Sequence, residues 1–257
     1  MSRRGEKTVV ITGASRGIGR AVAIELSKSN LFGNIVLVAR TEQDLVHTKR
    51  LMTKVPNVSL EVADLENSTE TVELVRRISK KYECIDVLVN VAGFVNPKSL
   101  LDMDLENWEK TFSVNVTSVF LLTREVVRIM KKTGGKILNI ASTAGMSPRP
   151  GWSAYAASKA ALISLSLTLS QELEEYDIKV YCVSPGRCAT DLRRVLAPDE
   201  DPTTIMQPQE VAEVVATLLS PKGDCLDGQN IVIRRQLSGV GREKVETAIE
   251  QVSVSGE

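Results

Sequence analysis

Seven short, nearly continuous apolar runs recur along the chain, and longer stretches with a helical pattern of polar and apolar positions separate them. The apolar runs lie at residues 7–12, 34–39, 58–64, 85–92, 135–142, 178–185 and 229–234. Strands that are covered on both faces show unbroken apolar runs rather than strict alternation. We therefore predict seven buried parallel strands.

The segments between these runs have the spacing typical of helices. They span residues 17–30, 42–53, 68–82, 105–131, 154–175 and 208–219. Strands that alternate with helices predict right-handed crossovers, and hence an α/β fold with a doubly wound, seven-stranded parallel sheet and helices on both faces. No Pro/Gly-rich linker divides the chain. We expect one domain over residues 1–235.

Two segments depart from this alternation. Residues 186–207 form a connection of roughly 20 residues with weak periodicity, and loops of that length are usually functional or mobile. Residues 236–257 follow the last strand and are mostly polar. We expect them to form a partly disordered C-terminal tail.

Charge and composition limit the possible partners. The 257 residues include 32 Lys and Arg and 32 Asp and Glu, so the formal net charge is zero, whereas a dedicated nucleic-acid binder usually has a basic excess. No apolar run approaches the ~20 residues of a membrane helix, and the N-terminus has no signal-peptide core. The four cysteines form no C-x-x-C pair. We expect a cytoplasmic protein with reduced thiols and no nucleic-acid or membrane partner.

The scarcity of histidine narrows the chemistry further. His47 is the only histidine, which argues against a zinc site and against catalysis with a histidine base. Acid–base chemistry must then come from Tyr, Lys or a carboxylate. Tyr155 and Lys159 lie four residues apart in a predicted helix, so their side chains share a face. A packed aromatic residue next to a lysine that reaches the helix edge would give the same spacing.

A glycine-rich turn follows the first predicted strand. In "TGASRGIG", glycines stand at positions 13, 17 and 19, and helix-forming residues follow. Glycines at such a turn let the backbone approach a pyrophosphate at a helix N-terminus. The position of this turn after the first strand of a doubly wound sheet favours a dinucleotide ligand.

The residues after the second predicted strand indicate which dinucleotide. NAD-binding units place a carboxylate about 20 positions beyond the glycines. Here Ala39 and Arg40 occupy that region, and a guanidinium pairs well with a 2′-phosphate. Arg16 in the glycine turn is a second candidate. Solvated surface arginines are the alternative, but we expect NADP(H) to be preferred over NAD(H).

Several motifs in order resemble those of the short-chain dehydrogenase/reductase family, over roughly residues 7 to 234. They are "TGASRGIG", "NVAG" at 90–93, "PGRCAT" at 185–190, and a serine, tyrosine and lysine in the order of the family's S…Y-x-x-x-K signature. "NVAG" has Val91 where the family more often has a second asparagine. The last predicted strand is followed by Arg234 and Arg235 rather than by the family's usual N-G-G.

The resemblance implies a Rossmann-type fold and hydride transfer between a nicotinamide and a carbonyl or alcohol. The catalytic residues that it implies are Asn115, Ser142, Tyr155 and Lys159. The cofactor-binding residues are Gly13, Ser15, Arg16, Gly17, Ile18, Gly19, Arg40, Asp64, Leu65, Asn90, Ala92, Gly93, Tyr155, Lys159, Pro185, Gly186 and Thr190. No metal is implied.

The chemistry of reduction fits these residue types. Tyr155 would donate a proton to the substrate oxygen, and the ammonium of Lys159 would lower the pKa of a phenol that ordinarily titrates near ~10. Ser142 would stabilise charge on the substrate oxygen. The resemblance further implies that Asn115 holds a helix distortion and a water that relays protons to Lys159.

Several alternatives remain at this stage. The leading expectation is NADPH-dependent reduction of a small-molecule carbonyl compound, and a non-catalytic NADP(H) sensor or a scaffold on the same fold is the alternative. The sequence resembles both 3-oxoacyl thioester reductases and small carbonyl reductases of the sepiapterin and benzil type. Apolar positions on helices 105–131 and 154–175 predict a homo-oligomer, a tetramer or a dimer.

Overall fold

Seven parallel strands form a single sheet in the computed structural model, which describes residues 6–53 and 57–235. The strand order is β3-β2-β1-β4-β5-β6-β7. The strands are β1 (Thr8–Thr12), β2 (Asn34–Ala39), β3 (Asn57–Val62), β4 (Val87–Asn90), β5 (Gly135–Ile140), β6 (Ile178–Pro185) and β7 (Asn230–Ile233). This arrangement confirms the predicted doubly wound, Rossmann-type fold.

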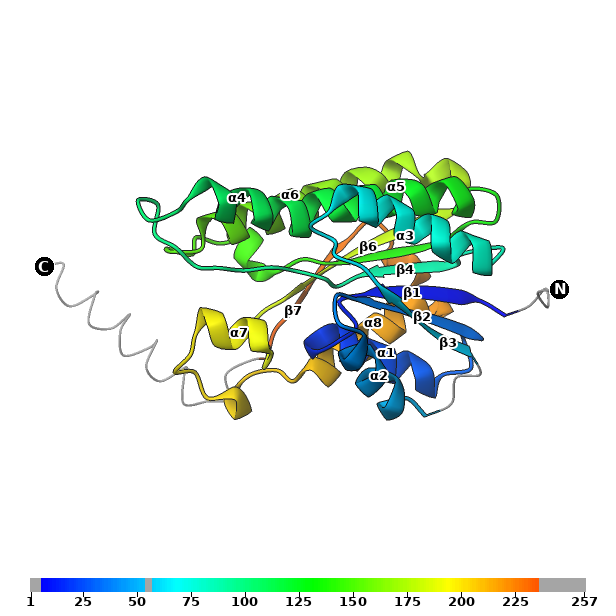
Figure 1. The fold of residues 1–257 in the computed structure, drawn as a ribbon, viewed down its shortest axis with the longest axis horizontal. Coiled ribbons are helices and arrows are strands. Elements are labelled where there is room, and N and C mark those ends of the chain that lie inside the picture. Colours follow the sequence, from blue (N-terminus) through cyan, green and yellow to red (C-terminus); the bar gives the residue numbers. More distant parts are fainter. Residues whose placement is uncertain (1–5, 54–56, 236–257) are drawn as a thin grey trace, which may run out of the picture.

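The described residues form eight α-helices, and most of these cover the two faces of the sheet (Figure 1). They are α1 (Gly17–Lys28), α2 (Glu42–Leu51), α3 (Ser68–Lys81), α4 (Leu105–Phe112), α5 (Ser118–Met130), α6 (Ser153–Glu172), α7 (Asp191–Leu196) and α8 (Pro208–Leu219). The helices α1, α2 and α8 pack on one face, and α3, α5 and α6 pack on the other.

The two layers follow from the alternation of side chains along each strand. In β1, Val9 and Ile11 belong to the core under α1 and α8, and Val10 points to the core under α3 and α5. All three are at most 1% exposed. Because both faces are buried, both sets of positions are apolar, which explains the continuous runs in the sequence.

The predicted helix 105–131 is interrupted in the structure. A five-residue π-helical turn, Ser113–Thr117, separates α4 from α5. The apolar periodicity continues through this turn and does not reveal it, whereas the family resemblance implied a helix distortion at Asn115, which lies inside the turn. Such turns occur frequently at functional sites.

The long connection after β6 also has more structure than its sequence pattern predicts. It contains the short helix α7, which Thr190 caps by accepting a hydrogen bond from the Arg193 backbone nitrogen at 3.1 Å. In Figure 1, α7 stands beside the carboxyl ends of the strands. The predicted polar tail at 236–257 lies outside the described residues. Among the helices in the described part of the chain, none is long and apolar enough to cross a membrane.

Candidate active site

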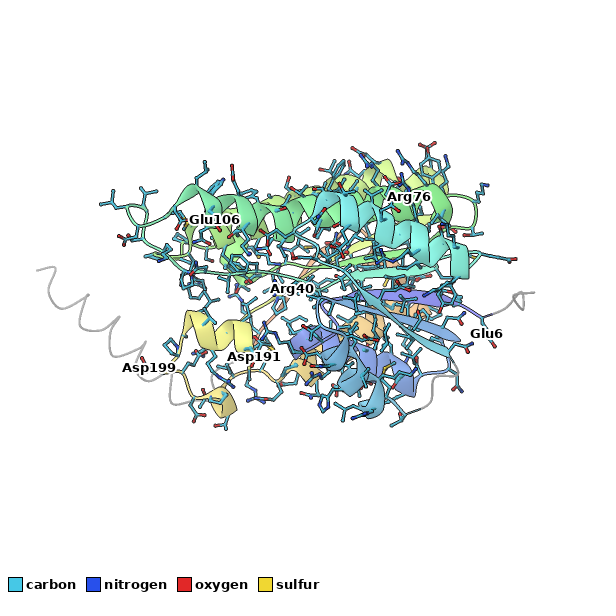
Figure 2. The ribbon with its side chains drawn as sticks, viewed as in Figure 1. Glu6, Arg40, Arg76, Glu106, Asp191 and Asp199 are labelled. Carbon is cyan, nitrogen blue, oxygen red and sulfur yellow. The ribbon has the colours of Figure 1, made fainter. Side chains whose placement is uncertain are left out.

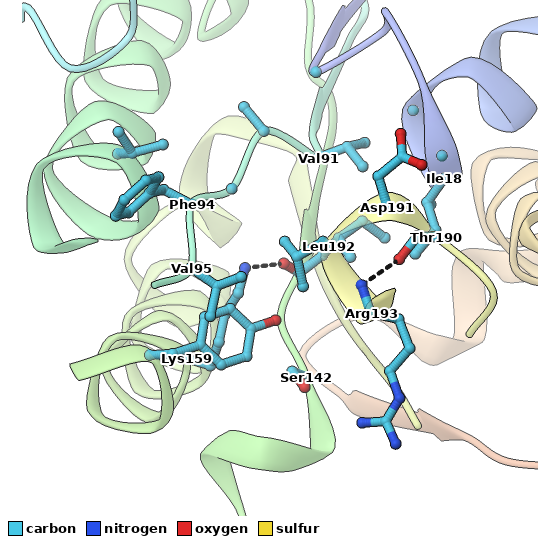
Figure 3. A pocket seen from close by; sticks show the side chains of 18 of the residues that line it. Ile18, Val91, Phe94, Val95, Ser142, Lys159, Thr190, Asp191, Leu192 and Arg193 are labelled. Carbon is cyan, nitrogen blue, oxygen red and sulfur yellow. Dashed lines mark hydrogen bonds between the residues drawn. The ribbon is translucent and has the colours of Figure 1, made fainter. Parts of the chain in front are cut away.

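A cavity of about 710 Å³ opens at the carboxyl ends of the strands. Its walls come from the glycine turn after β1, the ends of β2, β4, β5 and β6, the start of α6, and α7. Figure 3 shows part of this cavity, with α7 facing the ends of the strands. Open α/β sheets bind ligands at this edge, where the strand order reverses between β1 and β4.

Backbone fills the floor of the cavity at the glycine turn. Gly13 has φ +65°, and a Cβ there would lie 2.8 Å from the Ala92 backbone. The Thr12 hydroxyl fixes the segment after β4. It accepts hydrogen bonds from the backbone nitrogens of Val91, at 3.0 Å, and Ala92, at 3.2 Å. Glycine at position 13 therefore permits β1 and β4 to end in direct backbone contact.

The N-terminus of α1 opens directly into the cavity. Gly17, Ile18 and Gly19 form its first turn, and no side chain caps this end. Free backbone N–H groups and the helix dipole favour an anion at such a position. A Cβ at Gly19 would collide with the Gly13 carbonyl oxygen, so the close return of the helix also needs glycine.

The far end of the cavity contains the residues expected to bind adenosine and its phosphate. Arg40 follows β2 and is exposed, and Asp64 and Leu65 follow β3. Arg16 lines the same cavity and forms a 3.4 Å ion pair with Asp191 of α7. Figure 2 labels Arg40 near the centre of the view and Asp191 on α7. This end of the cavity has two guanidinium groups.

Tyr155 and Lys159 lie one turn apart on α6 and face the cavity. Both are buried, with 7% and 3% of their surface exposed. The Lys159 ammonium donates a hydrogen bond to the Ile140 carbonyl oxygen at 2.8 Å. Ser142 follows β5 and accepts a hydrogen bond from the Ala144 backbone nitrogen at 3.1 Å. These three side chains form a compact polar group in the wall.

The pKa values of this group reflect its burial. Burial raises the pKa of Tyr155 to about 12, and a hydrogen bond from Ser142 and the charge of Arg193 offset part of that rise. Burial lowers the pKa of Lys159 to about 8. From the sequence we expect Lys159 to lower the pKa of the phenol. In the structure, desolvation is the largest influence on the pKa of Tyr155, and it acts in the opposite direction.

Asn115 occupies the centre of the π-helical turn and is fully buried. Its side-chain oxygen accepts a hydrogen bond from the Phe94 backbone nitrogen at 2.7 Å. Its amide nitrogen donates to the Phe94 carbonyl at 2.9 Å and to the Ser158 hydroxyl at 3.0 Å. The turn therefore connects the segment after β4 to α6, between Tyr155 and Lys159.

Most of the residues selected from the sequence line one cavity. They are Gly13, Ser15, Arg16, Gly17, Ile18, Gly19, Arg40, Asp64, Leu65, Ala92, Gly93, Ser142, Tyr155, Lys159, Pro185, Gly186 and Thr190. Asn90 and Asn115 lie behind the wall. The Asn90 amide donates to the Asn139 side chain at 2.8 Å, so its side chain supports the ends of β4 and β5.

Sequence reasoning missed several lining residues near Tyr155. Phe94, Val95, Arg149, Trp152 and Leu192 line the cavity on this side. They lie in loops or short elements without periodicity, and only their place beside recognised motifs could have indicated them. Two arginines of the long connection 186–207, Arg187 and Arg193, also line the cavity.

Comparison with known proteins gives a consistent result. The family model for the short chain dehydrogenase matches residues 7–201. A 3-oxoacyl-[acyl-carrier-protein] reductase of Synechocystis is 35% identical over 234 residues, which cover 87% of this chain and 93% of that protein. A 2,3-dihydro-2,3-dihydroxybenzoate dehydrogenase of Bacillus subtilis is 37% identical over 197 residues, covering 76% of this chain and 75% of that protein.

Solved structures show the same likeness. A variant of actinorhodin polyketide ketoreductase, solved with NADPH, matches with a TM-score of 0.82 and 28% identity. The match covers 91% of this chain and 98% of that one. Levodione reductase matches with a TM-score of 0.80 and 25% identity, over 89% of this chain and 96% of that one.

Proposed function

The chain belongs to the short-chain dehydrogenase family, and we propose that it uses NADPH to reduce the carbonyl group of a small molecule to an alcohol. Its relatives are oxidoreductases, and the chain is an NAD(P)-dependent oxidoreductase that acts on CH–OH or C=O groups. The observation that carries the proposal is the group formed by Ser142, Tyr155 and Lys159, which lines the same cavity as the glycine turn.

The residues at the glycine turn fit a dinucleotide. A side chain at Gly13 or Gly19 would collide with neighbouring backbone atoms, so this tight turn needs glycine at both positions. The N-terminus of α1, which no side chain caps, suits a pyrophosphate. Arg16 and Arg40 suit the 2′-phosphate that distinguishes NADPH from NADH. When bound, the cofactor supplies the hydride for the reaction.

The chain's own residues then control the proton. In reduction, the carbonyl carbon gains the hydride and the Tyr155 hydroxyl donates its proton to the carbonyl oxygen. A pKa of about 12 keeps that hydroxyl protonated at neutral pH, so it is ready to donate. The Ser142 hydroxyl hydrogen-bonds the same oxygen and stabilises the charge that develops there. In oxidation the same steps run in reverse.

Lys159 holds a positive charge near the reacting groups. Its ammonium stabilises the phenolate that remains after proton donation, and in this proposal it also binds the nicotinamide ribose. Asn115 acts through structure, because its three hydrogen bonds fix the backbone of Phe94 and the α6 residues around Tyr155 and Lys159. We assign these roles as part of the proposal.

A homo-oligomer, either a dimer or a tetramer, is also part of the proposal. Trp108 on α4, Phe120 on α5 and Leu167 on α6 expose between 36% and 43% of their surface. Exposed apolar side chains on neighbouring helices favour burial against another copy. A monomeric mass by light scattering at micromolar concentration would contradict this.

We further propose that residues 1–235 act as one domain and that the protein is cytoplasmic.

The direct test is an assay of NADPH oxidation with a panel of acyl thioesters, diketones, pterins and ketose phosphates. We expect turnover with at least one class and a loss of turnover in Tyr155→Phe. Cofactor binding without turnover on the whole panel would instead favour the alternative, a non-catalytic NADP(H) sensor.

A further inference from the structure

The cavity is much more positive than the chain as a whole. Lys and Arg equal Asp and Glu in number over the full sequence. The carboxylates that line the cavity are only Asp64 and Asp191 among the described residues, whereas the cationic lining residues are Arg16, Arg40, Lys110, Arg149, Lys159, Arg187 and Arg193. The phosphates of a dinucleotide explain the positive charge of Arg16 and Arg40. The cationic residues near Tyr155 need another explanation.

Helix α7 separates the two charged regions. Asp191, at its start, pairs with Arg16 on the side of the glycine turn. Arg193, two residues later, has its guanidinium 5.7 Å from the Trp152 ring centre, three residues before Tyr155. Figure 3 shows Asp191 directed toward Ile18, whereas Arg193 extends on the side where Ser142 lies. Arg193 therefore belongs to the substrate end.

Two guanidinium groups share one carboxylate at this end. Arg193 binds Glu200 through Nε at 2.6 Å and Nη2 at 2.8 Å, and Arg187 binds the same carboxylate at 3.1 Å. The side chains of Arg193 and Glu200 are only 18% and 15% exposed. Glu200 does not line the cavity, whereas both arginines do. The cluster therefore presents an excess positive charge to the cavity.

The arginines also have N–H donors that Glu200 does not use. A guanidinium has five N–H donors, and Glu200 takes two from Arg193 and one from Arg187. Arg149 lines the cavity from the loop before Trp152, and its side chain forms no ion pair or hydrogen bond with the described residues. Glu200 and Trp152 hold Arg193 in place, so little side-chain entropy is lost when a ligand binds it.

We propose that Arg149, Arg187 and Arg193 form a subsite for an anionic group, a carboxylate or a phosphate, on the same molecule as the carbonyl that is reduced. The position of the carbonyl rests on the proposed function of Tyr155. The subsite selects charged ketones over neutral ones, because guanidinium groups form charge-assisted hydrogen bonds with an oxyanion, and the Arg193 side chain is only 18% exposed. Glu200 orients the arginines and at the same time competes with the substrate anion.

The test compares the binding of matched charged and neutral ligands by calorimetry. The pairs are acetoacetate with methyl acetoacetate, and dihydroxyacetone phosphate with dihydroxyacetone. Each is titrated into the protein alone and into its NADPH complex. We expect the charged member of at least one pair to bind about tenfold more tightly, and the pair that shows this distinguishes a carboxylate from a phosphate.

Three variants separate the subsite from a merely structural cluster. Arg149→Gln removes an exposed charge and should weaken the charged ligand about tenfold while leaving the neutral one unchanged. Glu200→Gln removes the competing carboxylate and should strengthen the binding of the charged ligand. Arg76→Gln, on the surface of α3 and away from the cavity, is the control and should change neither.

The outcomes also distinguish this proposal from the proposed function. Equal affinity for both members of each pair, or unchanged binding of the charged ligands in Arg149→Gln, overturns the anion subsite even where NADPH binds and neutral ketones are reduced. Failure to bind NADPH contradicts the proposed function, and the titrations of the protein alone still decide the subsite.

Discussion

The Lys159 ammonium nitrogen lies 5.8 Å from the centre of the Tyr155 ring, one helical turn away on α6. Both side chains are buried, so neither charge state of the pair has the solvation that water would provide. Burial favours the neutral form of each group, which raises the pKa of the phenol and lowers that of the ammonium. The pair is therefore sensitive to substitution and to pH.

Tyr155→Phe should keep cofactor binding and lose turnover by about 10²- to 10⁴-fold, the usual contribution of a general acid. The substitution removes the hydroxyl and keeps the ring. Tyr181→Phe is the matched control, because Tyr181 is fully buried on β6 and its hydroxyl has no hydrogen-bond partner among the described residues. Steady-state kinetics and NADPH fluorescence measure the two effects. Similar turnover in both variants would make Tyr155 a structural aromatic residue.

Reduction should slow as the pH rises through about 8. Burial lowers the pKa of Lys159 to about 8, so its ammonium is charged below that pH and loses its proton above it. The pH profile of kcat/KM should therefore show a descending limb there. Lys159→Arg keeps its charge throughout this range, so that limb should disappear even if the maximal rate falls. An unchanged limb in Lys159→Arg would assign the titration to another group.

The strands could be predicted from the sequence because their signal is local. Each strand buries both of its faces, so a run such as 34–39 is apolar at every position but the first and coincides with β2. The glycine turn could also be predicted from the sequence. The close approach of Gly13 to the Ala92 backbone excludes any side chain, so the turn needs glycine at this position.

Features that depend on contacts distant in sequence could not be predicted from the local pattern. The π-helical turn exists where Asn115 bonds Phe94 and Ser158, and the helical periodicity continues on both sides of it, so only the family resemblance indicated a helix distortion there. Helix α7 has six residues, too few for a periodic signal. The pKa of Tyr155 was expected to fall, because sequence spacing indicates the nearby ammonium but not the extent of burial.

Asn115→Leu should destabilise the fold by about 3 kcal/mol. Leucine has a similar size but leaves the Phe94 backbone N–H and C=O groups without their partner, and each unsatisfied buried group costs about 1–3 kcal/mol. Urea denaturation measures the change. Thr117→Val, an exposed position in the same turn, is the control and should stay within about 0.5 kcal/mol. Equal stability of the two variants would show that the Asn115 hydrogen bonds do not hold the turn.

Arg40→Asp should invert or abolish the preference for NADPH over NADH. Arg40 lines the cavity directly after β2, is exposed and forms no ion pair with the described residues, so its guanidinium is available to a 2′-phosphate. A carboxylate at the same position repels that phosphate and accepts a hydrogen bond from the ribose hydroxyl of NADH. The ratio of kcat/KM for the two cofactors, measured with one carbonyl substrate, gives the preference.

Arg50→Asp is the matched control for this change. Arg50 lies at the exposed end of α2, outside the cavity, and the substitution alters the net charge by the same amount. The ratio should stay at its original value in this variant, since a distant surface charge is screened by salt. Arg16 remains in Arg40→Asp, and because it pairs with Asp191 it offers only part of its charge to the phosphate. Equal kcat/KM for both cofactors in the unaltered protein, or the same shift in both variants, would mean that Arg40 does not read the 2′-phosphate.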